Sequence, residues 1–299
     1  AKVGQITISE CKSLSYSDFR ISHSQTSVKT SAILSDFALC EACKKEFYEP
    51  TNARFHYPFI TCTHCGVRFS LIKKLPYDRK NTTMSEFKMC KRCQSEYENP
   101  TNRRFHAQPI SCPECAIVSY LANDYEKVLC KDEKAFKEAA KLLKQGKILA
   151  MKGVGGFHLI CDALNQKAVK ELRVRKNRPA KPLAVLCKDL AMAQTLAHIN
   201  AKEAEILDSA VKPIVLLKAK VELGQIAFDT DKIGIMLAYT PFQLLLFEYF
   251  DSPLIATSAN LSGESIIYKE KDLFSKLNGV FDALLSFERD IENPSDDSI

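Results

Sequence analysis

Eight of the twelve cysteines form four Cys-x2-Cys pairs, and this arrangement restricts the fold more than any other feature of the sequence. The pairs begin at Cys40, Cys62, Cys90 and Cys112, with 18 residues between the two pairs of each half. A shift of 50 residues lays the second half on the first, and thirteen of the 29 positions from 37 to 65 are then identical. The sequence therefore predicts two copies of one small module.

Each module carries the ligands of a closed zinc site. Four thiolates complete a tetrahedral shell and leave no position for a substrate, so both ions are expected to be structural. Modules this small have too little core to fold without metal. Disulfide bonds are the alternative for an oxidising compartment. Consecutive pairs are favoured as ligand sets because the repeat then closes on itself, although the spacing also allows the first pair to join the fourth. The expected ligands are Cys40, Cys43, Cys62, Cys65, Cys90, Cys93, Cys112 and Cys115.

Composition places the chain among soluble globular proteins. Of its 299 residues 46% are hydrophobic and 26% charged, which excludes wholesale disorder. No apolar run approaches the length of a membrane span, and the first twenty residues contain no apolar core of a secretory signal. A cytoplasmic protein is expected. The net charge of +6 permits a nucleotide or nucleic-acid partner without requiring one.

Beyond the last cysteine pair, strand and helix patterns alternate, which predicts an α/β or α+β domain. We expect Asp132 and Asn200 to cap helices, the latter in a capping box with Glu203. The expected strands lie at 148–151, 157–161, 183–187, 214–217, 233–237, 254–257 and 283–287. The expected helices lie within 132–146, from 165 onward, and at 189–198, 200–210, 241–250 and 269–277.

Three segments of this domain could carry chemistry. Six cations fall between Lys170 and Lys181, although a solvated helix end explains such a cluster equally well. The glycine-rich turn 152–157 matches neither the dinucleotide fingerprint nor the Walker loop. The polar segment 257–263 follows a buried strand, a common place for a ligand, and a simple polar turn is the alternative. Pattern alone predicts an anion-binding crevice.

Together these segments resemble the HypF family of hydrogenase maturation carbamoyltransferases. The resemblance rests on CTHCGVRFS, PTNRRFHAQPISCPEC, GGFHLICDA, RVRKNRPAKPLAVL, IGIMLAYTPFQLLLF and PLIATSANLSGE. It implies a middle fragment of a longer protein, with two zinc fingers similar to those of DnaJ before a YrdC-like nucleotide-binding domain. The expected limits are a linker from a missing acylphosphatase-like domain at 1–35, fingers at 36–70 and 86–120, the YrdC-like domain at 125–288, and a linker to a missing transferase domain at 289–299.

The resemblance also implies an activity. Family members hydrolyse carbamoyl phosphate to carbamate, activate carbamate with ATP to carbamoyl adenylate, and transfer the carbamoyl group to the C-terminal cysteine of HypE. This reaction sequence supplies the cyanide ligands of [NiFe] hydrogenase. The fragment is expected to retain the adenylation step, with ATP bound together with Mg²⁺.

The family's Lys-x-Arg and Ser-x-Asn motifs match Lys176 with Arg178 and Ser258 with Asn260. The resemblance assigns these four residues to nucleotide binding and catalysis. Preplaced cations would stabilise charge on the reacting phosphates, and the hydroxyl and amide would orient the groups. Lys181 and His158 are weaker candidates for nucleotide binding, and Lys152 is weaker still.

Three alternatives remain open at this point. A threonylcarbamoyl-adenylate synthase for tRNA modification shares the YrdC-like domain and its motifs. A zinc-dependent module that binds double-stranded RNA would instead use a concave basic surface. The fingers themselves could serve as a docking platform for HypE or for neighbouring domains, because saturated zinc leaves them no chemistry of their own.

Overall fold

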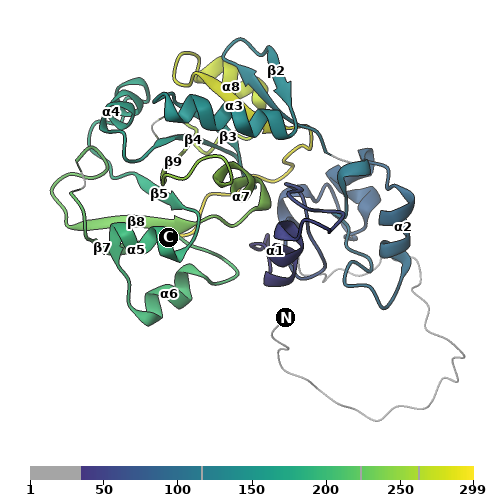
Figure 1. Ribbon diagram of the computed structural model, residues 1–299. Helices are drawn as coiled ribbons and strands as arrows, with labels where there is room; N and C mark the ends of the chain where they lie inside the picture. Colours follow the sequence, from purple (N-terminus) through teal and green to yellow (C-terminus); the bar gives the residue numbers. More distant parts are fainter. Residues whose placement is uncertain (1–34, 116, 223, 262) are drawn as a thin grey trace, which may run out of the picture.

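The computed structural model describes residues 35–115, 117–222, 224–261 and 263–299, so the predicted linker at 1–35 lies almost entirely outside the described residues. The two four-cysteine modules lie side by side against one flank of an α/β domain (Figure 1). No helix in the described ranges combines the length and the apolar character that a bilayer span requires.

Each four-cysteine module contains one short α-helix that follows its first cysteine. In the first module this is α1 (Glu41–Tyr48) and in the second α2 (Lys91–Glu98). Turns and 3-10 helices form much of the remainder, and these helices are η1 (Phe69–Leu71), η2 (Arg79–Asn81), η3 (Thr83–Glu86) and η4 (Pro113–Cys115).

The sequence repeat is also a repeat of backbone conformation. His56 and His106 occupy equivalent positions, and both have positive φ angles, 50° and 51°. The amide of His56 donates to the carbonyl of Phe47 at 2.9 Å, and the amide of His106 donates to that of Tyr97 at 3.0 Å. Both histidines therefore have a structural role in a turn, outside the sulfur clusters.

The α/β domain is built on one ten-stranded mixed sheet of order β2-β1-β10-β3-β4-β9-β5-β8-β7-β6. The pairs β10–β3 and β5–β8 are parallel, and the other neighbours are antiparallel. The strands are β1 (Ser119–Asn123), β2 (Val128–Lys131), β3 (Leu149–Lys152), β4 (Phe157–Asp162), β5 (Ala184–Cys187), β6 (Ala197–His198), β7 (Val215–Ala219), β8 (Lys232–Leu237), β9 (Leu254–Ser258) and β10 (Ala283–Phe287).

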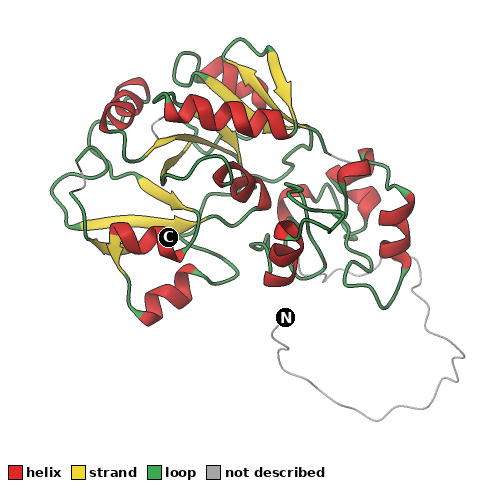
Figure 2. Cartoon of the chain, in the orientation of Figure 1, coloured by secondary structure: helices red, strands yellow, loops and turns green. Residues whose placement is uncertain are grey.

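Helices cover both faces of this sheet (Figure 2). Successive strand residues point to opposite faces, so in β3 Leu149 and Met151 join one core while Ala150 joins the other. The first core includes α3 (Glu133–Lys144) and α7 (Pro241–Phe247). The second includes α4 (Gln166–Arg175), α5 (Leu190–Leu196), α6 (Ala201–Leu207) and α8 (Glu270–Lys276).

The seven strands and six helices expected in this domain are present at the expected places, and Asn200 caps α6 in a capping box with Glu203. Asp132 stands at the N-cap position of α3 as expected, but its side chain accepts no capping hydrogen bond and its backbone has a φ of 52°. The pattern missed β1, β2 and the two-residue β6, which lies where the helix expected at 189–198 was to end, and the sheet starts before residue 125. Strand β2 is mostly exposed, so it lacks the alternation that reveals a strand.

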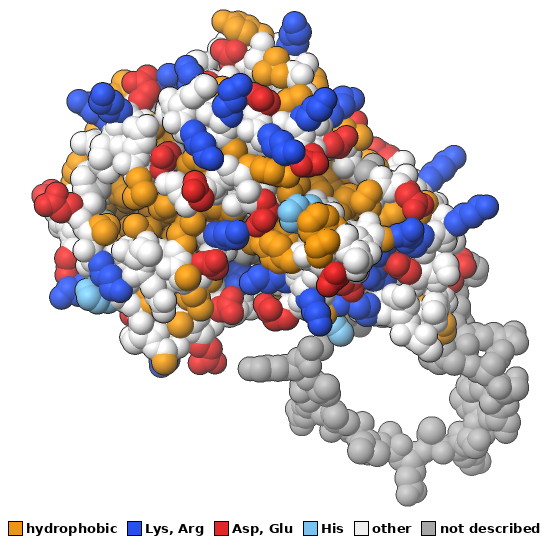
Figure 3. Space-filling view, in the orientation of Figure 1, with side chains coloured by type: hydrophobic (Ala, Val, Ile, Leu, Met, Phe, Trp, Pro, Cys, Tyr) orange, Lys and Arg blue, Asp and Glu red, His pale blue; other side chains and the backbone are white. Residues whose placement is uncertain are grey.

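The first module shares a hydrophobic core with the α/β domain. Phe59 packs against the rings of Phe242, with centroids 5.9 Å apart, and Phe287, with centroids 5.1 Å apart. The backbone of Leu39 also donates to the carbonyl of Tyr239 at 2.9 Å. The first module is therefore part of the domain's packing, and on the face shown in Figure 3 hydrophobic side chains gather where the two parts meet.

The shared core gives the first prediction. Replacing Phe59 with alanine should lower the free energy of unfolding of the α/β domain by about 3 kcal/mol, because a buried aromatic ring leaves a cavity. Phe55→Ala is the matched control, since Phe55 is 39% exposed in the same module. Urea denaturation followed by far-ultraviolet circular dichroism measures both. Equal losses in the two variants would contradict a shared core.

Candidate functional site

The eight paired cysteines form two separate sulfur clusters, each built from consecutive pairs. Within each cluster the sulfur atoms lie within 4.8 Å of one another. Neighbouring sulfurs are 3.7 Å (Cys40 to Cys62) and 3.8 Å (Cys62 to Cys65) apart in the first cluster. A tetrahedral zinc ion with Zn–S bonds of about 2.3 Å requires sulfurs about 3.8 Å apart. The donor set and its spacing therefore fit zinc.

The second cluster has the same spacing. Its neighbouring sulfurs are 3.5 Å (Cys90 to Cys112), 3.9 Å (Cys112 to Cys115) and 3.6 Å (Cys93 to Cys115) apart. With four thiols closing each cluster, bound zinc would hold the polypeptide together and would have no open position for a substrate.

Arginine side chains connect the two clusters across the module boundary. Arg54 of the first module binds Glu96 of the second with both terminal nitrogens, at 3.1 and 2.6 Å. Its Nε donates to the carbonyl of Ser111 at 2.9 Å, and Nη2 lies 3.4 Å from Sγ of Cys93. Arg54 is 2% exposed, so this is a buried, charge-assisted contact with the second metal site.

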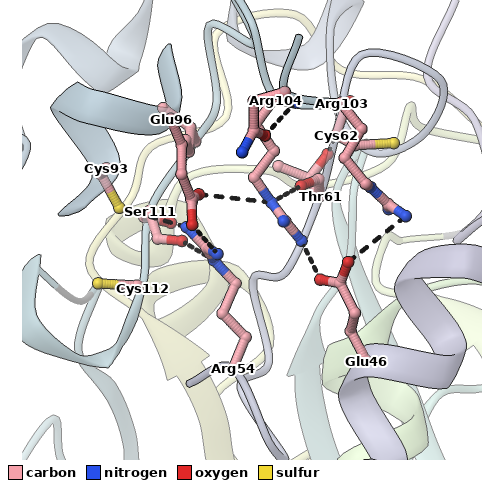
Figure 4. A network of polar contacts seen from close by, with 12 residues as sticks. Glu46, Arg54, Thr61, Cys62, Cys93, Glu96, Arg103, Arg104, Ser111 and Cys112 are labelled. Atoms are coloured by element: carbon pink, nitrogen blue, oxygen red, sulfur yellow. Dashed lines mark hydrogen bonds and ion pairs between the residues drawn. The ribbon is translucent and has the colours of Figure 1, made fainter. Parts of the chain in front are cut away.

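Arginines of the second module make corresponding contacts with the first module (Figure 4). Arg104, the repeat equivalent of Arg54, donates from Nε to the carbonyl of Thr61 at 3.0 Å and pairs with Glu46. Arg103 lies against Sγ of Cys43. The repeat makes these residues visible in the sequence, but it cannot show that each arginine serves the other copy.

The predicted nucleotide residues meet at one edge of the sheet, where β9 ends. Lys176 follows the last turn of α4, and its Nζ donates to the carbonyls of Ser258 (2.6 Å) and Asn260 (3.0 Å). It also donates to Oδ1 of Asn260 at 2.8 Å, and Oγ of Ser258 donates to the same oxygen at 3.0 Å. The two predicted motifs are thus joined through direct hydrogen bonds.

Burial, and to a lesser degree the charge of Arg178, lowers the pKa of Lys176 to about 8. All three acceptors of the ammonium group are neutral oxygens, so none of them compensates its positive charge. Arg178 donates to the carbonyl of Pro182 at 2.8 Å, and burial lowers its pKa as well. Two partly desolvated cations at one sheet edge favour an anion.

Arg173 belongs to the same basic cluster but has a different role. It is 4% exposed and donates to the carbonyls of Arg178 (2.9 Å), Lys181 (3.1 Å), Gln225 (2.6 Å) and Ile226 (3.0 Å). These bonds hold the loop that carries the Lys-x-Arg motif. Sequence reasoning grouped Arg173 with the other cations, because charge pattern does not distinguish a buried arginine from an exposed one.

The three weaker candidates for nucleotide binding have different surroundings in the structure. The side chain of Lys181 is exposed. Lys152 is buried and donates to the carbonyl of Phe287 at 2.9 Å, with Glu270 at 3.7 Å, so it stabilises the junction with β10. Only His158, among these three, stands directly opposite a motif residue, because the β4–β9 register pairs it with Ser258.

His158 has a partner that sequence reasoning missed. Its Nε2 lies 2.8 Å from Oδ2 of Asp297. Burial alone would lower the pKa of His158, but the carboxylate of Asp297 outweighs burial and the pKa is raised. Asp297 falls in the segment that was predicted to be a linker, and its separation of 139 residues from His158 leaves no local signal.

Comparison with known proteins covers both parts of the chain. The family model described as "Telomere recombination", for Sua5, YciO and YrdC proteins, matches residues 141–299, and that described as "HypF finger" matches residues 39–72 and 89–119. The carbamoyltransferase HypF of Synechocystis sp. is 46% identical over 300 residues, which cover 99% of this chain and 39% of that protein. The chain thus spans less than half the length of this relative.

Two further relatives inform the α/β domain. A crystal structure of full-length HypF in the phosphate- and nucleotide-bound form has a TM-score of 0.83 at 43% identity, covering 89% of this chain and 35% of that chain. A threonylcarbamoyl-AMP synthase of Pyrococcus abyssi is 29% identical over 153 residues, covering 48% of this chain and 45% of that protein.

The crossed arginines give the second prediction. In the zinc-loaded protein, Arg54→Gln should speed zinc release from the second cluster and lower the free energy of unfolding by about 2 kcal/mol, because Glu96 loses its bidentate partner and keeps only Arg104, whose Nε lies 4.0 Å away. A chromogenic chelator follows release over time. Arg92→Gln is the control: its pair with Glu114, at 3.3 Å, is exposed on both sides, so the expected change is below about 1 kcal/mol. Equal release rates would show that the arginine does not couple the modules.

Proposed function

The chain belongs to the HypF family, with an α/β domain of the Sua5, YciO and YrdC type, and from this premise we propose that this domain activates carbamate with ATP. The products are carbamoyl adenylate and pyrophosphate, and the reaction serves [NiFe]-hydrogenase maturation. Hydrolysis of carbamoyl phosphate, and transfer of the carbamoyl group to the C-terminal cysteine of a HypE-like acceptor, are proposed for the longer polypeptide that the relatives represent.

One observation supports the proposal above the others: Lys176 is desolvated beside Ser258 and Asn260, with no charge on any of its three acceptors. The ammonium group is preorganised for an anion, and Arg178 adds a second cation. A HypF relative has been crystallised with phosphate and nucleotide bound. Phosphate groups of ATP are the anions that best match both facts.

The proposed step is a displacement at the α-phosphorus. A carbamate oxygen forms a bond to that phosphorus, the bond to the oxygen bridging the α- and β-phosphates breaks, and pyrophosphate leaves with the electron pair. Lys176 and Arg178 stabilise the negative charge that builds on the phosphoryl and leaving groups. Ser258 and Asn260 orient the reactants. ATP is expected to arrive with Mg²⁺, which neutralises part of the triphosphate charge.

The second candidate is a threonylcarbamoyl-AMP synthase, favoured by the 29% identity of about half of this chain to such an enzyme. It would use the same nucleotide residues with threonine and bicarbonate in place of carbamate. The two HypF-type fingers and the full-length match to HypF favour the carbamate reaction. Charges of both signs are interspersed on the face shown in Figure 3, which gives the RNA-binding alternative no support from that side.

Pyrophosphate exchange into ATP gives the third prediction. Ammonium carbamate should support exchange, and threonine with bicarbonate should not. Lys176→Met should reduce the rate by roughly a hundredfold, because it removes a preorganised cation. Lys170→Met is the matched control, since Lys170 lies exposed on the same helix. Exchange with threonine alone would favour the second candidate over the first.

The lowered pKa of Lys176 gives the fourth prediction. As pH rises through about 8 the ammonium group loses its proton, so ATP binding should weaken above that pH. In Lys176→Arg the side chain stays positively charged to much higher pH, so this loss of ATP affinity should disappear. Isothermal titration with ATP and Mg²⁺ between pH 6.5 and 9.5 measures the effect. An affinity that is independent of pH in the wild type would rule out a titrating lysine at the nucleotide.

A further inference from the structure

The segment that carries Asp297 is fastened into the site by three other parts of the molecule. Nδ2 of Asn293 donates to the carbonyls of Phe69 (2.7 Å) and Ile72 (2.8 Å), both in the first module. The amide of Ser295 donates to the carbonyl of Gly155 at 3.1 Å. Further on, the carbonyl of Ser298 accepts from the amide of Ile214 at 2.8 Å, just before β7. These contacts fix the backbone on both sides of Asp297.

The fixed backbone brings Asp297 onto His158. His158 is 4% exposed, and its Nε2 lies 2.8 Å from the carboxylate. The hydroxyl of Tyr239 lies 3.5 Å from the other carboxylate oxygen. Because His158 and Ser258 are directly paired on adjacent strands, their side chains leave the same face of the sheet, about 5 Å apart at Cβ.

The charges around His158 favour the imidazolium form. Asp297 and Asp296, from the C-terminal segment, raise its pKa, while burial and Lys176 at the end of α4 oppose them, and the net shift is upward. Tyr239 contributes no charge, because burial raises its pKa well above the ordinary value. The other ionisable groups that line the adjoining cavity are Asp36 and Lys212.

The second ring nitrogen of His158 is Nδ1. Nδ1 is buried and has no hydrogen-bond partner among the described residues. It faces Gly153, where an added Cβ would come within 3.0 Å of it. His158 also lines a cavity of about 310 Å³, together with Asp36, Gly155, Tyr239 and the segment 295–298. A buried N–H without an acceptor is unfavourable, and an anionic oxygen would satisfy it.

We propose that Asp297 is a positioning residue, which holds His158 as an imidazolium so that Nδ1–H binds an anionic oxygen of the substrate, of the carboxylate or phosphate class. The assignment of that anion to carbamate or a phosphate of ATP rests on the proposed function, whereas the pairing of His158 with Asp297 does not. The first module takes part through Asn293, so it has a role in shaping the site.

Ring nitrogen NMR of the full 299-residue chain tests the pairing directly. Asp297→Asn should lower the pKa of His158 by about one to two units, because the ring loses its carboxylate partner. Asp296→Asn is the matched control and should lower it less, since that neighbour makes no hydrogen bond to the ring. Inorganic phosphate should shift the His158 resonances of the wild type, and more weakly those of Asp297→Asn. An unchanged pKa in Asp297→Asn overturns the proposal.

A second variant guards against misfolding of the first. Asn293→Ala releases the C-terminal segment from the first module without altering His158 or Asp297. Like Asp297→Asn, it should lower the pKa of His158. Unchanged thermal melting of either variant shows that the fold is intact. If both variants fold and neither moves the pKa, the segment does not position His158.

The pH profile of pyrophosphate exchange connects the pair to the reaction. In a Lys176→Arg background, the exchange rate should fall with rising pH as His158 loses its proton. Asp297→Asn should move this fall to lower pH by the amount that the pKa of His158 is lowered. A fall that stays in place overturns the inference while the proposed function stands. An Asp297-dependent pKa and phosphate response without carbamate-dependent exchange in the wild type overturns the proposed function and supports the anion site.

Discussion

The closure of the first four-cysteine cluster is the constraint on which the other parts of the structure depend. The module that it closes supplies Phe59 to the core of the α/β domain and the carbonyls of Phe69 and Ile72 to the C-terminal segment. A module with so little core needs cross-links to keep these groups in place. A zinc ion held by the four cysteine sulfurs, which lie at tetrahedral spacing, would provide them.

The candidate site shows what this packing achieves chemically. Two cations on one loop, a hydroxyl and an amide at the end of β9, and a histidine at the start of β4 come from separate elements that meet at one sheet edge. Arg173 donates to carbonyls of the loop that carries the cations, and the C-terminal segment is hydrogen-bonded to Gly155. The site is therefore preorganised by groups that need not touch the substrate.

Local pattern was sufficient for most of the fold. Alternating apolar residues and capping residues such as Asn200 located the buried strands and the helices between them, because these signals depend on near neighbours. The exposed edge strand β2 was missed, since its short apolar run of Val128 to Cys130 does not alternate with polar residues. The motifs predicted Lys176 and Ser258 as site residues, and the structure brings the two together, but no spacing could reveal Asp297, whose partner lies far away in the sequence.

The crossed arginines have a consequence for how such a chain can change over time. Arg54 neutralises Glu96 and Arg104 neutralises Glu46, so each copy of the repeat carries the counter-charge of the other. Removing one copy would take from a half-buried carboxylate of the other the arginine that pairs with it most closely, so neither module can be exchanged as an independent unit.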